Sequence, residues 1–487
     1  MTSTQAATQS RTAGADYPEL RLLIDGTWRT STVGSPVVDP ATEEVIGQVP
    51  HATPGDVDEA LRAAERAAAP WRAATPAERA AIIRDAARLL RERTGRIADV
   101  ITRELGKPRA ESAVEITTAL SILEWNADEG RRSYGRVIPG AAHRRQLVSV
   151  EPVGPVAAFA PWNAPLITPS RKISSALAAG CPVVIKPAEE TPGTAVCLAE
   201  AFVDAGLPAG VLNMIFGDPA QISDQLLDSG VIRAVTFTGS TVVGRQLAAK
   251  AALTMKRAVM ELGGHAPVVV CADADPVRVA AGAARAAYRN AGQICTSPTR
   301  FIVAAPVYDQ FVDALTTAVG QLRLGNGFDP DTEIGPMVGP RRLAAIEHLV
   351  KDAQEHGARV TVGGCRRPGP GYFFEPTVLA DVTDACEVSR VEPFGPLATV
   401  APFDDLDDAI SKANAVPFGL AGYIFTGDAA GMRRLEAELD CGAIAVNHWQ
   451  VSGPETPFGG HKDSGFGSEG GSEGIAAFQQ LKFVSEE

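Results

Sequence analysis

The sequence predicts an α/β protein built from open, mostly parallel sheets, and the alternation of strand-like and helix-like segments is the main reason. From Glu151 onward, short β-branched runs alternate with Ala-rich stretches at helical spacing. A second alternating series runs from Phe301 to about Val446. Size agrees, since 487 residues with 45% hydrophobic and 21% charged composition suffice for several folded units. Such sheets bind ligands at the carboxyl ends of their strands.

The predicted elements follow in chain order, beginning with a hairpin from Arg21 to Arg29 that turns at Asp25-Gly26. Apolar residues at three- and four-residue spacing predict helices in Asp56 to Trp71 and in Pro76 to Glu104. The strands expected next are short and β-branched: Val156 to Ala160, Val183 to Lys186, Val211 to Phe216, Ala234 to Thr238 and Val268 to Cys271. The helices expected later are amphipathic: Val277 to Arg289, Phe311 to Leu322, Leu343 to His356 and Asp405 to Ala413.

Charge and cysteine content exclude several classes of function. A net charge of -13 and a pI near 5.2 provide no basic field for nucleic acid or an anionic membrane. The uncharged window Pro152 to Ser170 contains five prolines and therefore predicts no spanning helix. Seven cysteines without a CxxC pair, and no HExxH, predict neither a disulfide scaffold nor a metal site. We expect a frayed tail at Met1 to Gly14 and a reducing, cytoplasmic location.

Two loops that follow predicted strands fit a dinucleotide. The segment 235 to 244 (VTFTGSTVVG) runs from a strand through Gly239 and Ser240 into a helix, whose amino end offers N–H groups to a pyrophosphate. In the segment 183 to 191 (VVIKPAEET), Glu189 follows Lys186 at a strand end. A carboxylate there accepts hydrogen bonds from a ribose and repels a 2′-phosphate, so the pair favours NAD over NADP. The alternatives are an ordinary strand-to-helix turn and a solvated ion pair.

Three polar residues have the chemistry of an acyl-transfer site. Cys295 follows a predicted helix in the run NAGQICT, and Glu261 ends a predicted strand before two glycines. A cysteine nucleophile needs a base, and the acyl enzyme that it forms needs a base to activate water. Asn163, between two prolines, carries an amide that suits a developing oxyanion. The alternatives are a buried structural thiol, a salt-bridged acid and a turn residue.

Several separated motifs together resemble the aldehyde dehydrogenase superfamily, from about residue 20 to the end. Within this superfamily, the chain most resembles the succinate-semialdehyde and 2-oxoglutarate-semialdehyde dehydrogenases. The segment from Asn447 to Ile475 also resembles the corresponding segment of these enzymes. The motifs stand in the order PWNAP (161 to 165), KPAEETP (186 to 192), FTGSTVVG (237 to 244), ELGG (261 to 264), GQIC (292 to 295), EPFGP (392 to 396) and PFGGHKDSG (457 to 465).

This resemblance implies roles for individual residues. Cys295 is the nucleophile, Glu261 the general base, and Asn163 with the Cys295 backbone N–H the oxyanion hole. Glu469 matches a second acid that relays protons in some members. The cofactor residues that it implies are Lys186 and Glu189 at the adenosine ribose, Gly239, Ser240 and Gly244 at the pyrophosphate, and Glu392 with Phe394 at the nicotinamide ribose and ring. Trp162, Leu262 and Gly263 are further implied cofactor-binding residues.

The resemblance also suggests a substrate class. Arg171 and Arg289 occupy positions where succinate-semialdehyde dehydrogenases bind the distal carboxylate, and a guanidinium fork suits that group. We therefore expect a short semialdehyde that carries a carboxylate. Trp449, Trp162 and Phe159 leave open an aromatic or aliphatic aldehyde. Further alternatives are a CoA-acylating dehydrogenase, a cofactor-free thiol esterase and a catalytically silent relative.

The implied fold is a Rossmann-like NAD-binding domain, an α/β catalytic domain and a small β oligomerisation arm. We expect a tail at 1–19, the NAD-binding domain at 20–129 and 151–262, and the catalytic domain at 263–463. The arm and terminal strand are expected at 130–150 and 479–487, with a connecting segment at 464–478. The arm implies a homodimer or homotetramer, in which the terminal strand adds to a neighbouring subunit's sheet.

Overall fold

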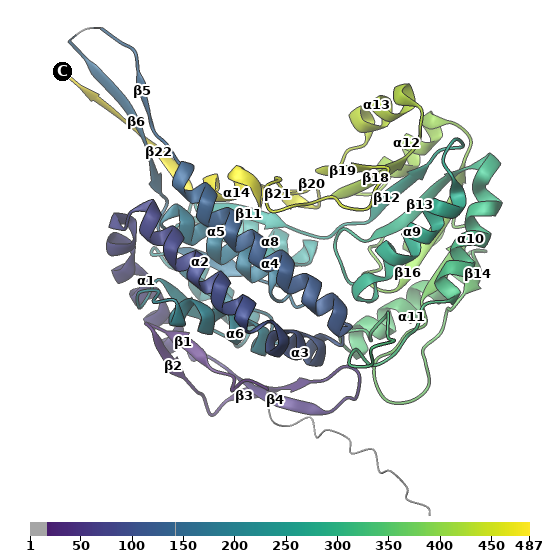
Figure 1. Cartoon of the computed structure of the whole chain (residues 1–487), viewed down its shortest axis with the longest axis horizontal. Helices are drawn as coiled ribbons and strands as arrows, with labels where there is room; N and C mark the ends of the chain where they lie inside the picture. The colour runs from purple at the N-terminus through teal and green to yellow at the C-terminus, as the bar shows by residue number, and fades with distance from the viewer. Residues whose placement is uncertain (1–16, 142) are drawn as a thin grey trace, which may run out of the picture.

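The computed structural model describes residues 17–141 and 143–487, so the tail expected at Met1 to Gly14 lies outside the described residues. Figure 1 shows two α/β lobes side by side: the purple to teal elements form the first, the green elements form the second, and the yellow carboxyl-terminal segment returns to the first. A narrow β arm projects from the first lobe (Figure 1). In the part described, no helix is both long and apolar enough to cross a bilayer.

The first sheet has eight strands in the order β2-β1-β9-β8-β7-β10-β11-β21. Its central strands β9, β8, β7, β10 and β11 run parallel. The chain first adds β8 and β9 on one side of β7, and then returns to add β10 and β11 on the other side. The ends of β7 and β10 therefore form a topological switch point, which is where open α/β sheets bind ligands. The bounds are β1 Leu22–Ile24, β2 Thr27–Arg29, β7 Val156–Phe159, β8 Val183–Lys186, β9 Leu212–Met214, β10 Ala234–Thr238, β11 Arg257–Glu261 and β21 Gly465–Phe466.

Helices cover both faces of this sheet. Two of them begin with capping boxes, in which Thr53 pairs with Asp56 and Thr75 with Glu78. The stretch predicted as helical from Pro76 to Glu104 is divided by Arg93, where ψ rises to 9° and a new helix begins. The apolar spacing continues across this break, which is why periodicity did not reveal it. The bounds are α1 Pro54–Ala73, α2 Pro76–Glu92, α3 Thr94–Leu105, α4 Arg109–Glu129, α5 Ile167–Ala179, α6 Pro192–Asp204, α7 Pro219–Asp228, α8 Thr241–Leu253 and α14 Gly471–Ala476.

The second sheet has seven strands in the order β14-β15-β16-β13-β12-β18-β19, all parallel except β14. The inner strands β12 and β18 are buried on both faces, as expected for a sheet covered by helices. The strands are β12 Ala266–Val270, β13 Pro298–Ala304, β14 Arg359–Val362, β15 Thr377–Ala380, β16 Leu397–Phe403, β18 Ala421–Phe425 and β19 Ala443–Val446. The helices are α9 Pro276–Tyr288, α10 Tyr308–Gly320, α11 Pro340–Glu355, α12 Leu406–Asn414 and α13 Ala429–Glu438.

The arm is a three-stranded antiparallel sheet in the order β22-β6-β5. β22 pairs with β6 of the same chain from Gln479 to Glu486, which brings the carboxyl terminus onto the arm (Figure 1). The arm strands are β5 Arg136–Ile138, β6 Arg145–Pro152 and β22 Gln479–Glu486. Smaller pairs complete the fold: β3 Gly34–Val38 with β4 Val45–Pro50, and β17 Phe418–Gly419 with β20 His461–Lys462. The predicted two-sheet architecture with its arm is confirmed.

The carboxyl ends of the strands in the first sheet face the amino ends of the strands in the second sheet. The chain crosses between them from Glu261, at the carboxyl end of β11, to Ala266, at the amino end of β12. The loops before β13 and β16 lie at the amino edge of the second sheet, because both strands run parallel within it. Residues near 295 and 392 therefore face the carboxyl edge of the first sheet.

Candidate active site

The junction between the sheets brings a thiol and a carboxylate together. The Sγ atom of Cys295 lies 3.5 Å from Oε1 of Glu261, although 34 residues separate them. Cys295 is partly buried, and Glu261 is only 4% exposed. Burial and the negative charge of Glu261 raise the pKa of the Cys295 thiol well above its usual range. The resting cysteine is therefore a neutral thiol that requires an adjacent base before it can attack.

Glu261 has the properties of such a base. Burial, followed by the negative charge of Glu469, raises the pKa of Glu261 to about 7, while Lys172 and Arg171 oppose the shift. A general base works best when its pKa lies near the operating pH, because it is then both available and basic enough. Near neutral pH, this carboxylate can accept a proton from the thiol or from a water molecule.

The loop that carries Cys295 has an uncommon backbone. Asn290 and Ala291 have φ values of 52° and 53°, and Gly292 continues the left-handed path at 69°. A Cβ at Gly292 would lie 2.0 Å from the carbonyl oxygen of Gly395, so a side chain is excluded there. Left-handed non-glycine residues cost energy and persist only where the surroundings hold them. The turn directs the following residues into the junction.

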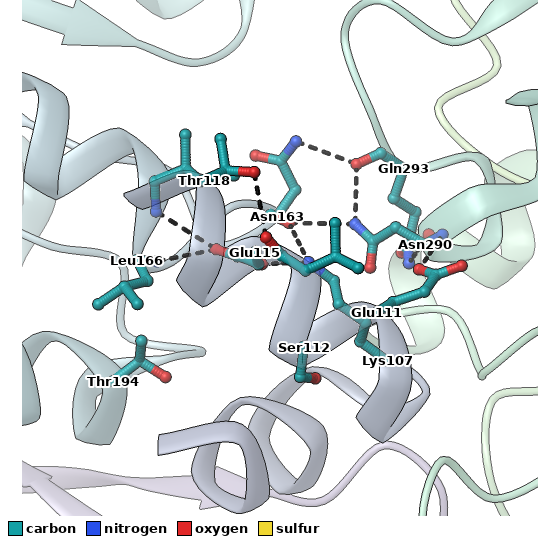
Figure 2. Close-up of polar contacts among 12 residues, drawn as sticks. Lys107, Glu111, Ser112, Glu115, Thr118, Asn163, Leu166, Thr194, Asn290 and Gln293 are labelled. Carbon is teal, nitrogen blue, oxygen red and sulfur yellow. Dashed lines mark hydrogen bonds and ion pairs between the residues drawn. The ribbon is translucent and has the colours of Figure 1, made fainter. Parts of the chain in front are cut away.

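Asn163 lies in the loop after β7, on the facing side of the junction. Its Nδ2 atom donates to the carbonyl oxygen of Gln293 at 3.0 Å, as Figure 2 shows. An amide nitrogen carries two N–H groups, so one holds the side chain in place and the second remains for a ligand. Asn163 is 8% exposed, in a region where a hydrogen bond to a developing oxyanion is strong.

Glu469 belongs to a buried triad that the sequence analysis recognised only in part. Lys172 contacts Oε1 of Glu469 and donates to the Thr236 hydroxyl at 2.9 Å, and that hydroxyl lies 3.1 Å from the same carboxylate oxygen. Lys172 was missed, although a lysine within the Ser- and Ala-rich stretch that forms α5, in a chain with only nine lysines, was a usable signal. The triad lies close enough to Glu261 to influence its pKa.

The two predicted substrate arginines have different surroundings. Arg171 on α5 is 7% exposed, and its Nε has no hydrogen-bond partner among the described residues. Its guanidinium lies 5.2 Å from the ring centre of Phe458, and its positive charge partly offsets the burial that raises the pKa values of Cys295 and Glu261. Arg289, in contrast, is exposed. The structure therefore brings Arg171, but not Arg289, into the buried part of the site.

The aromatic residues that favoured another substrate lie mostly in packed regions. Trp449 contacts Phe425 at 4.6 Å between ring centres, and a Cβ at Gly282 would lie 2.3 Å from its indole nitrogen. It therefore packs against the second sheet and α9. Phe159 pairs with Phe237 within the first sheet, at 6.4 Å. Trp162 packs against a predicted nicotinamide residue, with its ring 5.5 Å from that of Phe394.

The remaining residues that were predicted to bind the cofactor lie in loops near the ends of β8, β10 and β11 and in the loop before β16. Lys186 is buried and pairs with Glu189 at 2.5 Å, so this is not the solvated pair of the alternative interpretation. The first turn of α8 is open, with Val242 66% exposed, and Ser240 caps it. Glu392 accepts from the Gly264 N–H at 3.1 Å, and burial raises the pKa of Glu392 to about 8.

Glycines allow close approach at this end. A Cβ at Gly244 would lie 2.3 Å from Leu262, and one at Gly263 would lie 2.7 Å from Glu392. A side chain at either position would clash, so glycine is needed for α8 and Glu392 to pack closely against the loop after β11. An open helix terminus at a topological switch point, beside half-buried carboxylates, fits a dinucleotide.

An open α/β sheet with a dinucleotide-type helix terminus, facing a cysteine paired with a carboxylate, defines a cysteine-dependent dehydrogenase. The family model "Aldehyde dehydrogenase family" matches residues 28–484. The chain belongs to the aldehyde dehydrogenase family. The predicted family, enzyme class and NAD-dependent oxidation of an aldehyde are confirmed.

Several individual members of the family are similar to this chain over nearly its whole length. The chain is 45% identical over 466 residues to a putative 4-(hydroxymethyl)benzenesulfonate dehydrogenase of Comamonas testosteroni, covering 95% of this chain and 97% of that protein. It superposes on the succinate-semialdehyde dehydrogenase of Burkholderia pseudomallei with a TM-score of 0.95 and 38% identity, covering 98% of this chain and all of the other. Betaine aldehyde dehydrogenase of Staphylococcus aureus, solved with NAD⁺, gives a TM-score of 0.93 at 32% identity, covering 96% of this chain and 94% of the other.

Proposed function

We propose that this enzyme oxidises a short aldehyde bearing a distal anionic group to the corresponding acid, with Cys295 as nucleophile and Glu261 as base. The observation that carries the substrate class is the buried Arg171, whose Nε has no partner among the described residues. A buried guanidinium is costly unless an anion compensates its charge. Because Arg171 lies near Cys295, a bound anion would place the aldehyde of a short substrate at the thiol.

The proposed reaction begins when Glu261 takes the thiol proton and Sγ attacks the aldehyde carbon. The new oxyanion accepts hydrogen bonds from the free Asn163 N–H and the Cys295 backbone N–H. A bound nicotinamide supplies the hydride acceptor. Glu261 first passes the thiol proton to the triad of Lys172, Glu469 and Thr236, which restores its carboxylate. It then deprotonates the water that attacks the Cys295 thioester; the C–S bond breaks, the acid is released, and the leaving thiolate takes a proton back from Glu261.

The same arrangement supports the proposed cofactor contacts. Glu189, held by Lys186, faces the adenosine ribose, and the open first turn of α8 with Ser240 receives the pyrophosphate. Glu392 and Phe394 hold the nicotinamide end. A negative Glu189 at this position would repel a 2′-phosphate, which favours NAD over NADP.

Water is the proposed acceptor of the acyl group. Glu261 lies within contact of Sγ, where it can activate a water molecule that enters beside the thioester. A CoA-acylating enzyme would need no base for water at this point. The intact cysteine, carboxylate and amide also argue against a catalytically silent relative.

The distal anion is proposed to be a carboxylate, as in succinate semialdehyde. A sulfonate is the second candidate, because the Comamonas relative is named for a benzenesulfonate. Both groups accept hydrogen bonds from a guanidinium fork. The two are distinguished by comparing succinate semialdehyde, glutarate semialdehyde, 2-oxoglutarate semialdehyde and a 4-formylbenzenesulfonate with benzaldehyde and hexanal as uncharged references.

We expect Arg171→Ala to remove the preference for anionic aldehydes. The kcat/KM for the best anionic substrate should fall about 100-fold, since a charge-assisted buried pair contributes on the order of 2–3 kcal/mol. The values for benzaldehyde and hexanal should change little. Initial rates of NADH formation measure this directly.

Arg289→Ala is the matched control, because it removes the same side chain from an exposed position. The fall in kcat/KM for the anionic substrate should be several-fold smaller in Arg289→Ala than in Arg171→Ala. If uncharged aldehydes are preferred by the unmodified enzyme, or if Arg171→Ala lowers all substrates equally, the anion-binding role of Arg171 is wrong.

We also propose that the enzyme is a homodimer or homotetramer held in part by the arm. β22 forms the outer strand of the arm, and its apolar residues Leu481 and Phe483 are 64% and 56% exposed. Tyr134 and Val137 on the same arm are likewise exposed. Exposed apolar residues beside a free strand edge suit pairing with a second copy.

Deletion of Gln480 to Glu487 should therefore lower the mass of the assembly, because it removes the edge strand and both apolar side chains. Multi-angle light scattering at a fixed protein concentration measures this mass. A milder variant, Leu481→Glu with Phe483→Glu, keeps the β22 backbone and should act in the same direction. An unchanged mass in both variants would contradict the proposed role of the arm.

The location proposed for the enzyme is the cytoplasm. All seven cysteines are free thiols, and the structure contains Cys181, Cys197 and Cys386 in buried positions where no partner thiol is offered. Free thiols, including a reactive Cys295, persist best in a reducing compartment.

A further inference from the structure

One helix of the first lobe, α4, contacts both segments that form the proposed oxyanion hole: the loop of Asn163 and the loop of Cys295. α4 carries Glu111 and Glu115, which are one helical turn apart and therefore share a face. Glu115 is buried, with only 3% of its surface exposed, and Glu111 is partly buried. Neither residue belongs to the thiol, carboxylate and amide set described above.

Glu115 holds the side of the site that carries Asn163. Its Oε1 accepts from the backbone N–H of Leu166 at 2.9 Å and of Ile167 at 3.4 Å, at the start of α5. Its Oε2 pairs with Lys107, whose Nζ also lies 3.5 Å from the Asn163 carbonyl oxygen. The carboxylate thus holds the segment just after Asn163 directly, and contacts Asn163 itself through Lys107 (Figure 2).

Glu111 holds the side that carries Cys295. Its Oε2 accepts from the backbone N–H of Asn290 at 2.9 Å, the first residue of the left-handed turn. The Asn290 side chain then donates to the Asn163 carbonyl at 3.0 Å and to the Gln293 carbonyl at 3.2 Å. Asn163 donates to that same Gln293 carbonyl, so the two halves are joined by a closed set of hydrogen bonds (Figure 2).

We infer that Glu115 and Glu111 are positioning residues that align the Asn163 amide with the Cys295 loop. Glu115, paired with Lys107, is the stronger of the two, because it is the more deeply buried and holds two backbone N–H groups at once. This inference rests on the proposed oxyanion role of Asn163. An oxyanion donor acts only when it lies at hydrogen-bond distance from the developing charge, and a displacement of about 1 Å can cost on the order of 100-fold in rate.

The test is a double-mutant cycle between Glu115→Gln and Asn163→Ala, read as the rate of the first NADH formed per enzyme in stopped flow. Glutamine keeps one acceptor oxygen and the side-chain volume but loses the charge that holds Lys107. We expect Glu115→Gln alone to slow this rate about 10- to 100-fold, with a small change in the KM for NAD. In the Asn163→Ala background the same change should slow it less than about 3-fold, since the donor that it positions is gone.

A matched control separates positioning from stability. Glu104 is also a buried carboxylate that accepts from backbone N–H groups at a helix start, those of Gly193 and Thr194. Glu104→Gln should lower the thermal unfolding midpoint, as Glu115→Gln does, but leave the rate of the first NADH unchanged. Glu111→Ala should repeat the behaviour of Glu115→Gln in the same cycle.

The outcomes separate the oxyanion role of Asn163 from the positioning role of Glu115. If Asn163→Ala itself has no effect on the rate, the proposed oxyanion role is wrong. If Asn163→Ala slows the reaction but the two effects multiply, Glu115 does not act through Asn163; if Glu104→Gln slows it equally, the effect is one of general stability. Either result overturns the positioning role.

Discussion

Replacement of Cys295 by alanine should abolish NADH formation from every aldehyde, with kcat reduced by about 10,000-fold or more. The reason is that an aldehyde carbon releases hydride readily only once it is tetrahedral and bears an oxyanion, and Sγ is the atom proposed to make it so. Steady-state NADH absorbance at saturating aldehyde and NAD measures the loss. Binding of NAD, followed by fluorescence titration, should be retained because the dinucleotide loops are untouched.

Cys271→Ala is the matched control for this variant. Cys271 follows β12 at the carboxyl edge of the second sheet, whereas Cys295 precedes the neighbouring parallel strand β13 at the opposite edge. Its removal should leave kcat unchanged. Substantial residual activity in Cys295→Ala would mean that hydride transfer does not require the covalent intermediate.

Replacement of Glu261 by glutamine is the second large effect that we expect, with kcat lowered about 100- to 10,000-fold. Glutamine preserves the shape of the side chain but can accept a proton neither from the thiol nor from water. The variant should also lose a pH dependence that the unmodified enzyme shows. Since burial raises the pKa of Glu261 to about 7, the carboxylate is protonated below that pH and inactive as a base.

The sign of the pH effect follows from this ionisation. In the unmodified enzyme, kcat should fall about tenfold per pH unit below 7 and approach a plateau above 7, because the base is the deprotonated form. Profiles of kcat from pH 5.5 to 9, with a stability check at each pH, test this. Glu104→Gln is the control, since burial also raises the pKa of Glu104 to about 7 but that carboxyl contacts Gly193 and Thr194 rather than the thiol. A rise through pH 7 that persists in Glu261→Gln would assign it to another group.

Much of the fold could be predicted from local patterns. The strands Val183–Lys186 and Ala234–Thr238 have the predicted bounds, because short β-branched runs between glycine- and proline-rich loops report directly on buried parallel strands. The break at Arg93 was not predictable in the same way. The helix-period pattern continues on both sides of it, and only packing of α3 against α4 and α6 sets the change of direction.

The candidate site could be predicted where its residues lie in short motifs. Cys295, Glu261 and Asn163 each follow a predicted element, and their chemistry can be read from residue type. Lys172 was missed because its partner Glu469 is 297 residues away in the chain. The contacts of Glu115 with Leu166 and of Glu111 with Asn290 likewise join distant segments, 51 and 179 residues apart.

The sequence by itself determined the family, the class of reaction and the kinds of side chain that carry it, because these depend on residue identity and local spacing. Only the tertiary structure decided which polar and charged groups are buried away from solvent. Burial makes Glu261 a base near pH 7 and leaves Arg171 without a partner for its Nε among the described residues, whereas Arg289 remains exposed. Desolvation depends on every segment that packs around a group, and in this protein those segments come from both sheets and from the carboxyl-terminal residues near Glu469.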